Sequence, residues 1–249
     1  MGLFPGWGFV IYSSVTTVPY NPRQEAIEFT TDMPELISIP ISIFEATFNY
    51  KEPNILLWLD RGKTVQAIFT ALKPWNLLVD NVEIITTGKP SEQGIKFKLP
   101  EKQITFFFGP ALCKLSKDNA AWDSAEETIT IMDASFSALA NSANIEAATI
   151  QTVVALHLQP KTLPFIKILG RFVPAQLAAL DGEVKTMASI VKWDKWKVII
   201  DGSGQIANAI FLRFEREFEG TTDYQQIAEQ LRADEASLFA ILDVKEDRP

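Results

Sequence analysis

The sequence predicts an α+β protein with two similar lobes, each an antiparallel β-meander followed by one amphipathic helix. A series of short strand-like segments ends in a helical segment between residues 76 and 141, and the same order recurs between residues 150 and 247. One helix that covers one face of an antiparallel sheet is a stable two-layer arrangement. Each half of the chain can therefore bury its own apolar residues.

The chain of 249 residues is divided accordingly into three parts. Residues 1–53 are expected to be an N-terminal strand or irregular segment packed on the first lobe. Residues 54–148 form the first α+β lobe, and residues 149–249 form the second. Within the first part, the β-branched and aromatic run Ile37–Tyr50 predicts a strand, and Pro40 places it at a sheet edge or a strand start, because proline cannot donate to a ladder.

The first lobe begins with a loose helical stripe that stops before Pro74. The pair Ser124 and Glu127 has the spacing of a capping box, which satisfies orphan amides at a helix start. The helix that follows carries Ile129, Met132, Phe136 and Leu139 at helical spacing. The strands expected between these helices are 77–87, 95–99, 104–108 and 111–116.

In the second lobe, residues 184–193 and 196–201 flank Asp194 and Lys195, which predicts a hairpin with a two-residue loop. Asp223 is expected to cap the last helix, whose apolar positions begin at Tyr224 and recur to Leu242. Residues 245–249 read as a frayed, charged tail. The other strand-like segments of this lobe are 150–159 and 206–218, and the apolar run 165–169 leads to a short helix through Leu177 and Leu180.

Composition restricts the functional classes. Hydrophobic residues make up 47% of the chain and the formal net charge is −8, which favours a packed globular protein and disfavours nucleic acid as a partner. The single cysteine excludes an intrachain disulfide and a cysteine-based zinc cluster. The apolar start lacks a cationic region and is interrupted by Pro5 and glycines, so we expect no signal peptide, no membrane association and a cytoplasmic location.

Four patches carry a family resemblance: Phe106–Leu112, Trp122, Val154–Leu158, and a closing pair of segments, 223–228 and 237–240. With these patches the chain resembles a sporadically distributed family of uncharacterised bacterial proteins of about this length. The resemblance covers residues 54 to 249 and implies two related α+β halves. The succession of strands and a helix also resembles the export chaperone SecB, at the level of architecture only. Architecture does not transfer function.

His157 and Cys113 are the residues most suited to chemistry, and each occurs without a second residue of its type. Strand alternation predicts that His157 is a hydrogen-bonded or exposed sheet histidine. Cys113 is predicted to be a small buried hydrophobe, because a catalytic cysteine would need a base such as His157 to reach it across the fold. We expect neither a triad nor a metal site.

Residues 202–207 match the glycine fingerprint of a dinucleotide site after an apolar strand. That site needs a helix and a second parallel strand next. Here the segment from Asp223 onward is itself helical, so a glycine turn within a hairpin is predicted and no cofactor is expected. Nearby, Glu215, Glu217 and Glu219 alternate and predict a solvated strand face, which we place at a sheet edge that resists aggregation.

Four aromatic residues are the candidate partner-binding site: Trp7 and Phe9 in the apolar N-terminal segment, and Trp193 and Trp196 beside the predicted hairpin loop. Tryptophan is a favoured hot-spot residue, and an exposed apolar segment indicates an interaction surface. The alternative is that Trp193 and Trp196 form a cross-strand pair that stabilises the hairpin.

The sequence therefore predicts non-catalytic binding of a protein or peptide by sheet edges and exposed aromatics, with self-association into a homo-oligomer left open. This prediction depends on a high apolar content without a complete catalytic constellation. One alternative is a hydrolase-like enzyme that uses carboxylates in a cleft between the lobes. Another alternative is a structural or assembly subunit.

Overall fold

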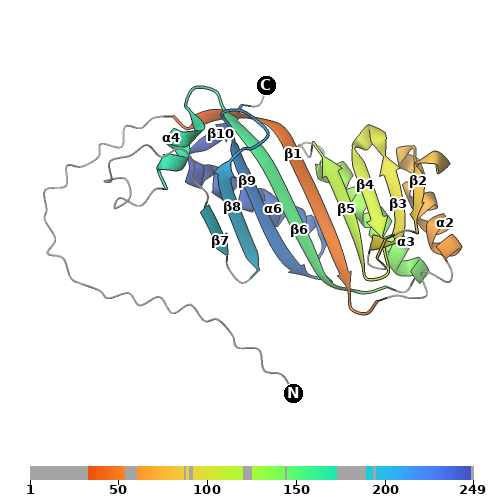
Figure 1. The fold of residues 1–249 in the computed structure, drawn as a ribbon. Helices are drawn as coiled ribbons and strands as arrows, with labels where there is room; N and C mark the ends of the chain where they lie inside the picture. The colour runs from red at the N-terminus through yellow and green to blue at the C-terminus, as the bar shows by residue number, and fades with distance from the viewer. Residues whose placement is uncertain are drawn as a thin grey trace, which may run out of the picture. The chain divides into compact units, whose positions relative to one another are not determined.

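Figure 1 shows a computed structural model of the chain, described for residues 33–53, 61–86, 88–89, 92–119, 125–143, 145–172, 189–192 and 195–247. The chain divides into two compact units, residues 1–33 and 34–249. Every helix and strand described here belongs to the second unit. The predicted domain boundaries at residues 53 and 148 stay predictions.

Among the described residues, ten strands form one sheet in the order β2-β3-β4-β5-β1-β6-β9-β8-β7, and β10 pairs with β1. All neighbours are antiparallel except β1 and β10. The predicted α+β class with a mostly antiparallel sheet is confirmed. The strands are β1 (Glu35–Tyr50), β2 (Val82–Ile85), β3 (Gly94–Leu99), β4 (Ile104–Phe108), β5 (Leu112–Asp118), β6 (Ala147–Pro160), β7 (Ser189–Lys192), β8 (Trp196–Gly202), β9 (Ile210–Glu219) and β10 (Val244–Glu246).

The described α-helices lie on one face of this sheet (Figure 1). Their buried positions are those of the predicted stripes: Ile129, Met132, Phe136 and Leu139 point into the core from one helix. The predicted cap of the last helix is also confirmed, since the Asp223 carboxylate accepts a hydrogen bond of 2.7 Å from the amide of Gln225. The helices are α2 (Arg61–Leu72), α3 (Ala125–Ala143), α4 (Phe165–Gly170) and α6 (Tyr224–Leu242), with short 3-10 turns at Lys73–Trp75, Val79–Asn81 and Pro100–Lys102.

Alternation along the strands gives the sheet two different faces. We call the face under the helices the covered face; on β1 it carries Phe44, Ala46 and Phe48, all buried. The opposite face, here called the open face, carries Ile43, Glu45 and the other intervening residues of β1, which are half-buried. This division follows from the period of two in a pleated strand.

The prediction that Pro40 confines its strand to an edge is wrong. β1 lies in the middle of the sheet, between β5 and β6. Pairing with β6 shifts register between Ser38 and Ile41, and pairing with β5 begins only at Ile43. Pro40 therefore falls in a bulge, where no ladder partner needs its missing amide hydrogen.

One further expectation for the second half is corrected. The segment predicted as a frayed tail overlaps β10, whose register with β1 runs from Glu35 opposite Val244 to Ile37 opposite Glu246. Asp243 ends α6 in the left-handed region (φ 53°, ψ 49°) and turns the chain back beside β1. The apolar run at 165–169 forms the short helix α4, and the short helix predicted through Leu177 and Leu180 lies outside the described residues.

Candidate functional site

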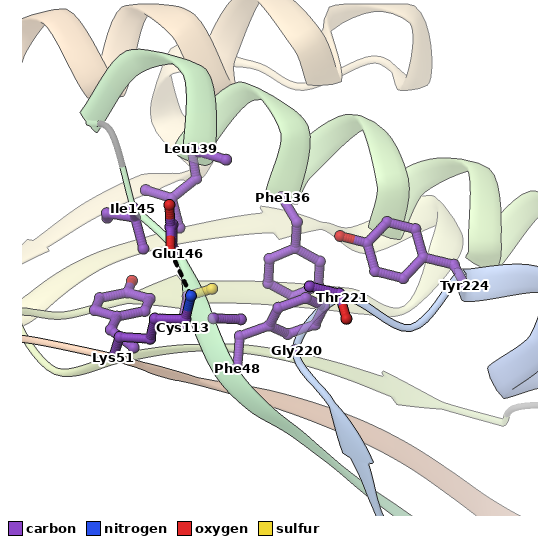
Figure 2. A pocket seen from close by; sticks show the side chains of 13 residues that line it. Phe48, Lys51, Cys113, Phe136, Leu139, Ile145, Glu146, Gly220, Thr221 and Tyr224 are labelled. Atoms are coloured by element: carbon purple, nitrogen blue, oxygen red, sulfur yellow. Dashed lines mark hydrogen bonds and ion pairs between the residues drawn. The ribbon is translucent and has the colours of Figure 1, made fainter.

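A cavity of about 490 Å³ lies between the covered face of the sheet and the helices α3 and α6 (Figure 2). Its size is within the range of about 300–1,000 Å³ that is usual for small-molecule sites. Elements distant in sequence meet here: the end of β1, the start of β5, the end of α3 and the start of α6. The lining residues are Phe48, Tyr50, Lys51, Cys113, Phe136, Leu139, Ala140, Ile145, Glu146, Ala147, Gly220, Thr221 and Tyr224.

Aromatic rings form one wall of the cavity. The rings of Phe48 on β1 and Phe136 on α3 stack with centroids 3.4 Å apart and an interplanar angle of 27°. The ring of Tyr224, at the first position of α6, lies 6.3 Å from Phe136 and 5.8 Å from Phe48. Figure 2 shows these three rings grouped on the side of the cavity opposite Leu139 and Ile145. Aromatic side chains provide large apolar surfaces to this wall.

The deep part of the cavity contains two polar groups that stay neutral. Tyr50 is 8% exposed and Cys113 is 1% exposed. Burial, and then the charge that a neighbouring Cys113 thiolate would carry, raises the pKa of Tyr50. Burial raises the pKa of the Cys113 thiol well above its ordinary value. The Tyr50 hydroxyl lies beside the Cys113 thiol and interacts with it, and the Tyr50 oxygen is inaccessible to solvent.

The mouth of the cavity is marked by an ion pair between exposed side chains. Lys51 Nζ lies 2.5 Å from Glu146 Oε2, and the two side chains are 56% and 72% exposed. The hydrogen bond from Lys51, and then its charge, lowers the pKa of Glu146. Gly220 lines the same region. The backbone of β6 comes close to it here, since a Cβ on Gly220 would lie 2.1 Å from the Ala147 carbonyl oxygen. A larger residue would force β9 away from β6.

His157 lies elsewhere, on the open face of β6. Its Nδ1 is 2.7 Å from Ser203 Oγ, and its ring lies 5.3 Å from the ring of Phe211. Burial lowers the pKa of His157, so the ring is neutral near pH 7. The Ser203 oxygen also accepts from the amides of Gln205 and Ile206. The prediction of a hydrogen-bonded sheet histidine is confirmed.

His157 cannot act as a base for Cys113. His157 shares the open face with its cross-strand partner Ile41, whereas Cys113 shares the covered face with its partner Phe48. Side chains on opposite faces of one sheet do not meet. Cys113 is a buried core residue, as predicted.

The glycine fingerprint at residues 202–207 is part of an antiparallel connection. Gly202 at the end of β8 pairs with Ile210 at the start of β9, and no helix intervenes. The predicted hairpin turn is therefore confirmed. The face predicted for the alternating glutamates is also confirmed: Glu215 pairs with Lys197 at 3.2 Å and Glu219 with Lys195 at 2.7 Å. Their placement at a sheet edge is wrong, since β9 lies between β6 and β8.

Of the four aromatic residues predicted to bind a partner, Trp7, Phe9 and Trp193 lie outside the described residues. Trp196 is half-buried and packs against the core from the covered face. The guanidinium carbon of Arg216 lies 5.2 Å from its ring centroid. The structure does not bring Trp196 to the cavity, and its predicted role in partner binding stays a prediction.

The sequence did not predict the cavity. Each of its aromatic residues falls on a face that alternation or helical spacing marks as buried, so the signal pointed only to a core. The shape of the cavity depends on how four elements distant in sequence approach one another, which no local pattern records. The one local hint is the pair of polar groups, Tyr50 and Cys113, at buried positions.

No protein-family model and no curated protein matches the chain. A structural match is the rolling circle replication initiator protein from Geobacillus stearothermophilus, with 10% sequence identity and a TM-score of 0.33, over 80% of each chain. No described helix is long and apolar enough to cross a membrane. The cytoplasmic location and the resemblance to a bacterial family stay predictions.

This structural match contradicts two sequence-based predictions, namely the protein- or peptide-binding role and the absence of a nucleic-acid partner. Both are withdrawn. The second rested on the net charge of −8, which averages over the whole surface. A TM-score of 0.33 is too low to argue for any particular activity of this chain.

Proposed function

We propose that the protein binds a small, mostly apolar organic molecule in the cavity between the covered face, α3 and α6. The observation that carries this proposal is a pocket of about 490 Å³ that opens to the surface beside the Lys51–Glu146 ion pair and is lined mainly by apolar and aromatic side chains. Small-molecule sites are clefts or cavities of about 300–1,000 Å³ lined predominantly by apolar and aromatic residues. The size and the lining of this pocket are typical of such a site.

The polarity of the lining supports this proposal. Apolar side chains surround the cavity, and the polar groups are few and separated: hydroxyls from tyrosine and threonine, one thiol, and the ion pair at the mouth. Small-molecule sites commonly combine an apolar wall with a few convergent polar groups. The wall provides affinity through buried area, and the polar groups orient the ligand.

The thiol and the deep hydroxyl favour binding over covalent chemistry. A thiol attacks as its thiolate, and the raised pKa of Cys113 keeps the proton on sulfur near pH 7. The histidine that could have served as its base lies on the other face of the sheet. The lining therefore provides surfaces and hydrogen bonds to a ligand.

Blocking the mouth of the cavity tests the proposal. Ala140 is exposed on α3 and lines the cavity, so A140W is expected to occupy the entrance without disturbing the core. Binding of the neutral fluorescent probe N-phenyl-1-naphthylamine would be titrated. The wild type is expected to bind it at one site, and A140W at least tenfold more weakly.

The matched control is S137W, which places the same ring on an exposed position of α3 that does not line the cavity. It is expected to bind the probe like the wild type. Absence of binding to the wild type, or equal binding by A140W and S137W, would contradict the proposal.

We also infer that the two halves of the sheet are related by duplication. Outward from the centre, β1 is followed by β5, β4 and β3, and β6 is followed by β9, β8 and β7. β1 and β6 pair antiparallel, and the helices α3 and α6 follow β5 and β9. This order supports two similar lobes in one continuous sheet. An experimental structure in which the two sets of strands fail to superpose would contradict the inference.

A further inference from the structure

We infer that the ligand of this cavity is an apolar primary amine, and that its ammonium group binds the Glu146 carboxylate at the mouth in place of Lys51. The inference rests on the proposed function and adds to it the chemistry of the ligand's polar end. It is carried by the ion pair at the mouth and by the charges on the elements around it.

The polar groups that a ligand can reach lie at the mouth of the cavity. Lys51, Glu146 and Thr221 line the cavity and are exposed, whereas Phe48 and Phe136 line it and are 5% and 4% exposed. An ionic group carried in among the aromatic rings would lose its hydration without a counter-ion. A charged ligand therefore keeps its charge at the mouth and places its apolar body against the rings.

Glu146 already binds a primary ammonium group at the mouth (Figure 2). Lys51 Nζ donates to Glu146 Oε2 at 2.5 Å, and this hydrogen bond, and then the charge of Lys51, lowers the pKa of Glu146. The ammonium of a ligand has the same charge and the same donors, so it can make the same bond. The Lys51 side chain is 56% exposed, and its displacement into water is easy because exposed ion pairs are weak.

The side-chain charges near the mouth favour a cation over an anion. By the same kind of exchange, a carboxylate would bind Lys51 in place of Glu146. Lys51 is, however, the one basic side chain among the described lining residues. Burial, and then the negative charge of Asp133, raises the pKa of Tyr224 in the aromatic wall, and Asp223 precedes that tyrosine. Carboxylates therefore outnumber basic groups on this part of the surface.

The ends of the two helices beside the cavity have the same effect. The last turn of α3 borders the cavity and contains no basic residue, so no side chain of that turn neutralises the negative end of its dipole. The positive end of α6 already faces the Asp223 carboxylate, which accepts a hydrogen bond from the amide of Gln225. The helix ends therefore favour a positive charge at the mouth.

Three probes with one naphthalene body and different polar ends test the inference: 2-(2-naphthyl)ethylamine, 2-(2-naphthyl)ethanol and 2-naphthylacetate. At pH 7 they are a cation, a neutral molecule and an anion. Their dissociation constants would be measured by titration calorimetry for the wild type, E146Q, K51Q and E52Q. E52Q is the matched control, because Glu52 is exposed and next to Lys51 in the sequence but does not line the cavity.

We expect the wild type to bind the amine more tightly than the alcohol or the carboxylate. E146Q is expected to bind the amine about two- to fivefold more weakly, which is the scale of one exposed ion pair, and the alcohol unchanged. K51Q is expected to bind the amine more tightly than the wild type does, because it removes the ammonium that competes for Glu146. E52Q is expected to bind all three probes like the wild type.

The opposite effects expected for E146Q and K51Q distinguish ligand binding from a structural role of the ion pair. If the pair only shaped the mouth, both substitutions would change the binding of all three probes in the same direction, and the inference would be overturned. Tightest binding of the carboxylate, or an amine affinity that E146Q leaves unchanged, would overturn it as well, while the cavity would remain a binding site. If none of the probes binds the wild type, the proposed function fails too.

Discussion

The two faces of the sheet are built from the same strands but are stabilised in different ways. The covered face buries large side chains such as Phe97, Phe106 and Phe214, each at most 1% exposed. The open face instead carries half-buried residues and ion pairs, such as Lys114 with Glu45 at 2.7 Å. Because successive residues of a strand point to opposite faces, neighbouring residues stabilise the fold differently. One contributes through packing in the core, and the next contributes through charges in contact with solvent.

Consecutive phenylalanines on β4 provide the strongest test of this comparison. Phe106 is 1% exposed on the covered face, where its ring lies 5.2 Å from that of Phe136. Phe107 is half-buried on the open face and packs over Gly94. We expect F106A to lower the free energy of unfolding by about 3–5 kcal/mol and F107A by about 1 kcal/mol. Urea denaturation measures both, and equal losses would contradict the division into two faces.

This division is also the part of the fold that the sequence predicts best. The alternation of Ile95, Lys96, Phe97, Lys98 and Leu99 predicts both the strand β3 and the faces of its side chains. The helices α3 and α6 are predicted for the same reason, since the spacing of their apolar residues and the Asp223 cap of α6 are local signals. What the sequence predicts here is the arrangement of side chains about one element.

Contacts between distant segments are harder to predict. The central place of β1 escaped prediction because Pro40 was weighed as a local signal, whereas the bulge that accommodates it depends on the partner β6. The strand β10 was not predicted for a similar reason. Its three residues pair with β1 only because the end of α6 places them beside that strand. The cavity is the extreme case, because its shape depends on four separate elements.

Charged pairs give a second and smaller test of the two faces. On the covered side, Arg216 donates to both oxygens of Asp234 at 2.6 and 2.7 Å, and Asp234 is 4% exposed. Removing one partner leaves the other charge poorly solvated, so D234A is expected to cost roughly 2–4 kcal/mol. On the open face, E45A removes the half-buried partner of Lys114 and is expected to cost about 0.2–1 kcal/mol.

Chemical denaturation at pH 7 would measure both substitutions. High salt provides a control, since screening reduces the contribution of the Glu45–Lys114 pair and leaves that of the buried Arg216–Asp234 pair largely unchanged. A larger loss for E45A than for D234A would show that the open face, not the covered one, depends on its charges.

The smallest expected change in stability concerns His157. This residue lies on the open face but is buried, as residues of the covered face are. In the folded protein, burial lowers the pKa of the His157 side chain below the value of 6.5 expected for an unperturbed histidine. As pH falls, the unfolded chain therefore takes up the proton first. The free energy of unfolding is expected to be constant above about pH 7 and to decrease as the pH falls through 6.5 toward the folded pKa.

The chain has one histidine, so the interval between pH 5 and pH 8 reports mainly on this residue. H157N keeps an acceptor near the position of Nδ1 and removes the titration; it is expected to flatten the dependence. S203A removes the hydroxyl at 2.7 Å but leaves the ring buried, so it is expected to lower stability while keeping the slope. Because burial rather than the hydrogen bond lowers the pKa, a flat profile for S203A would contradict this explanation, as would an unchanged slope for H157N.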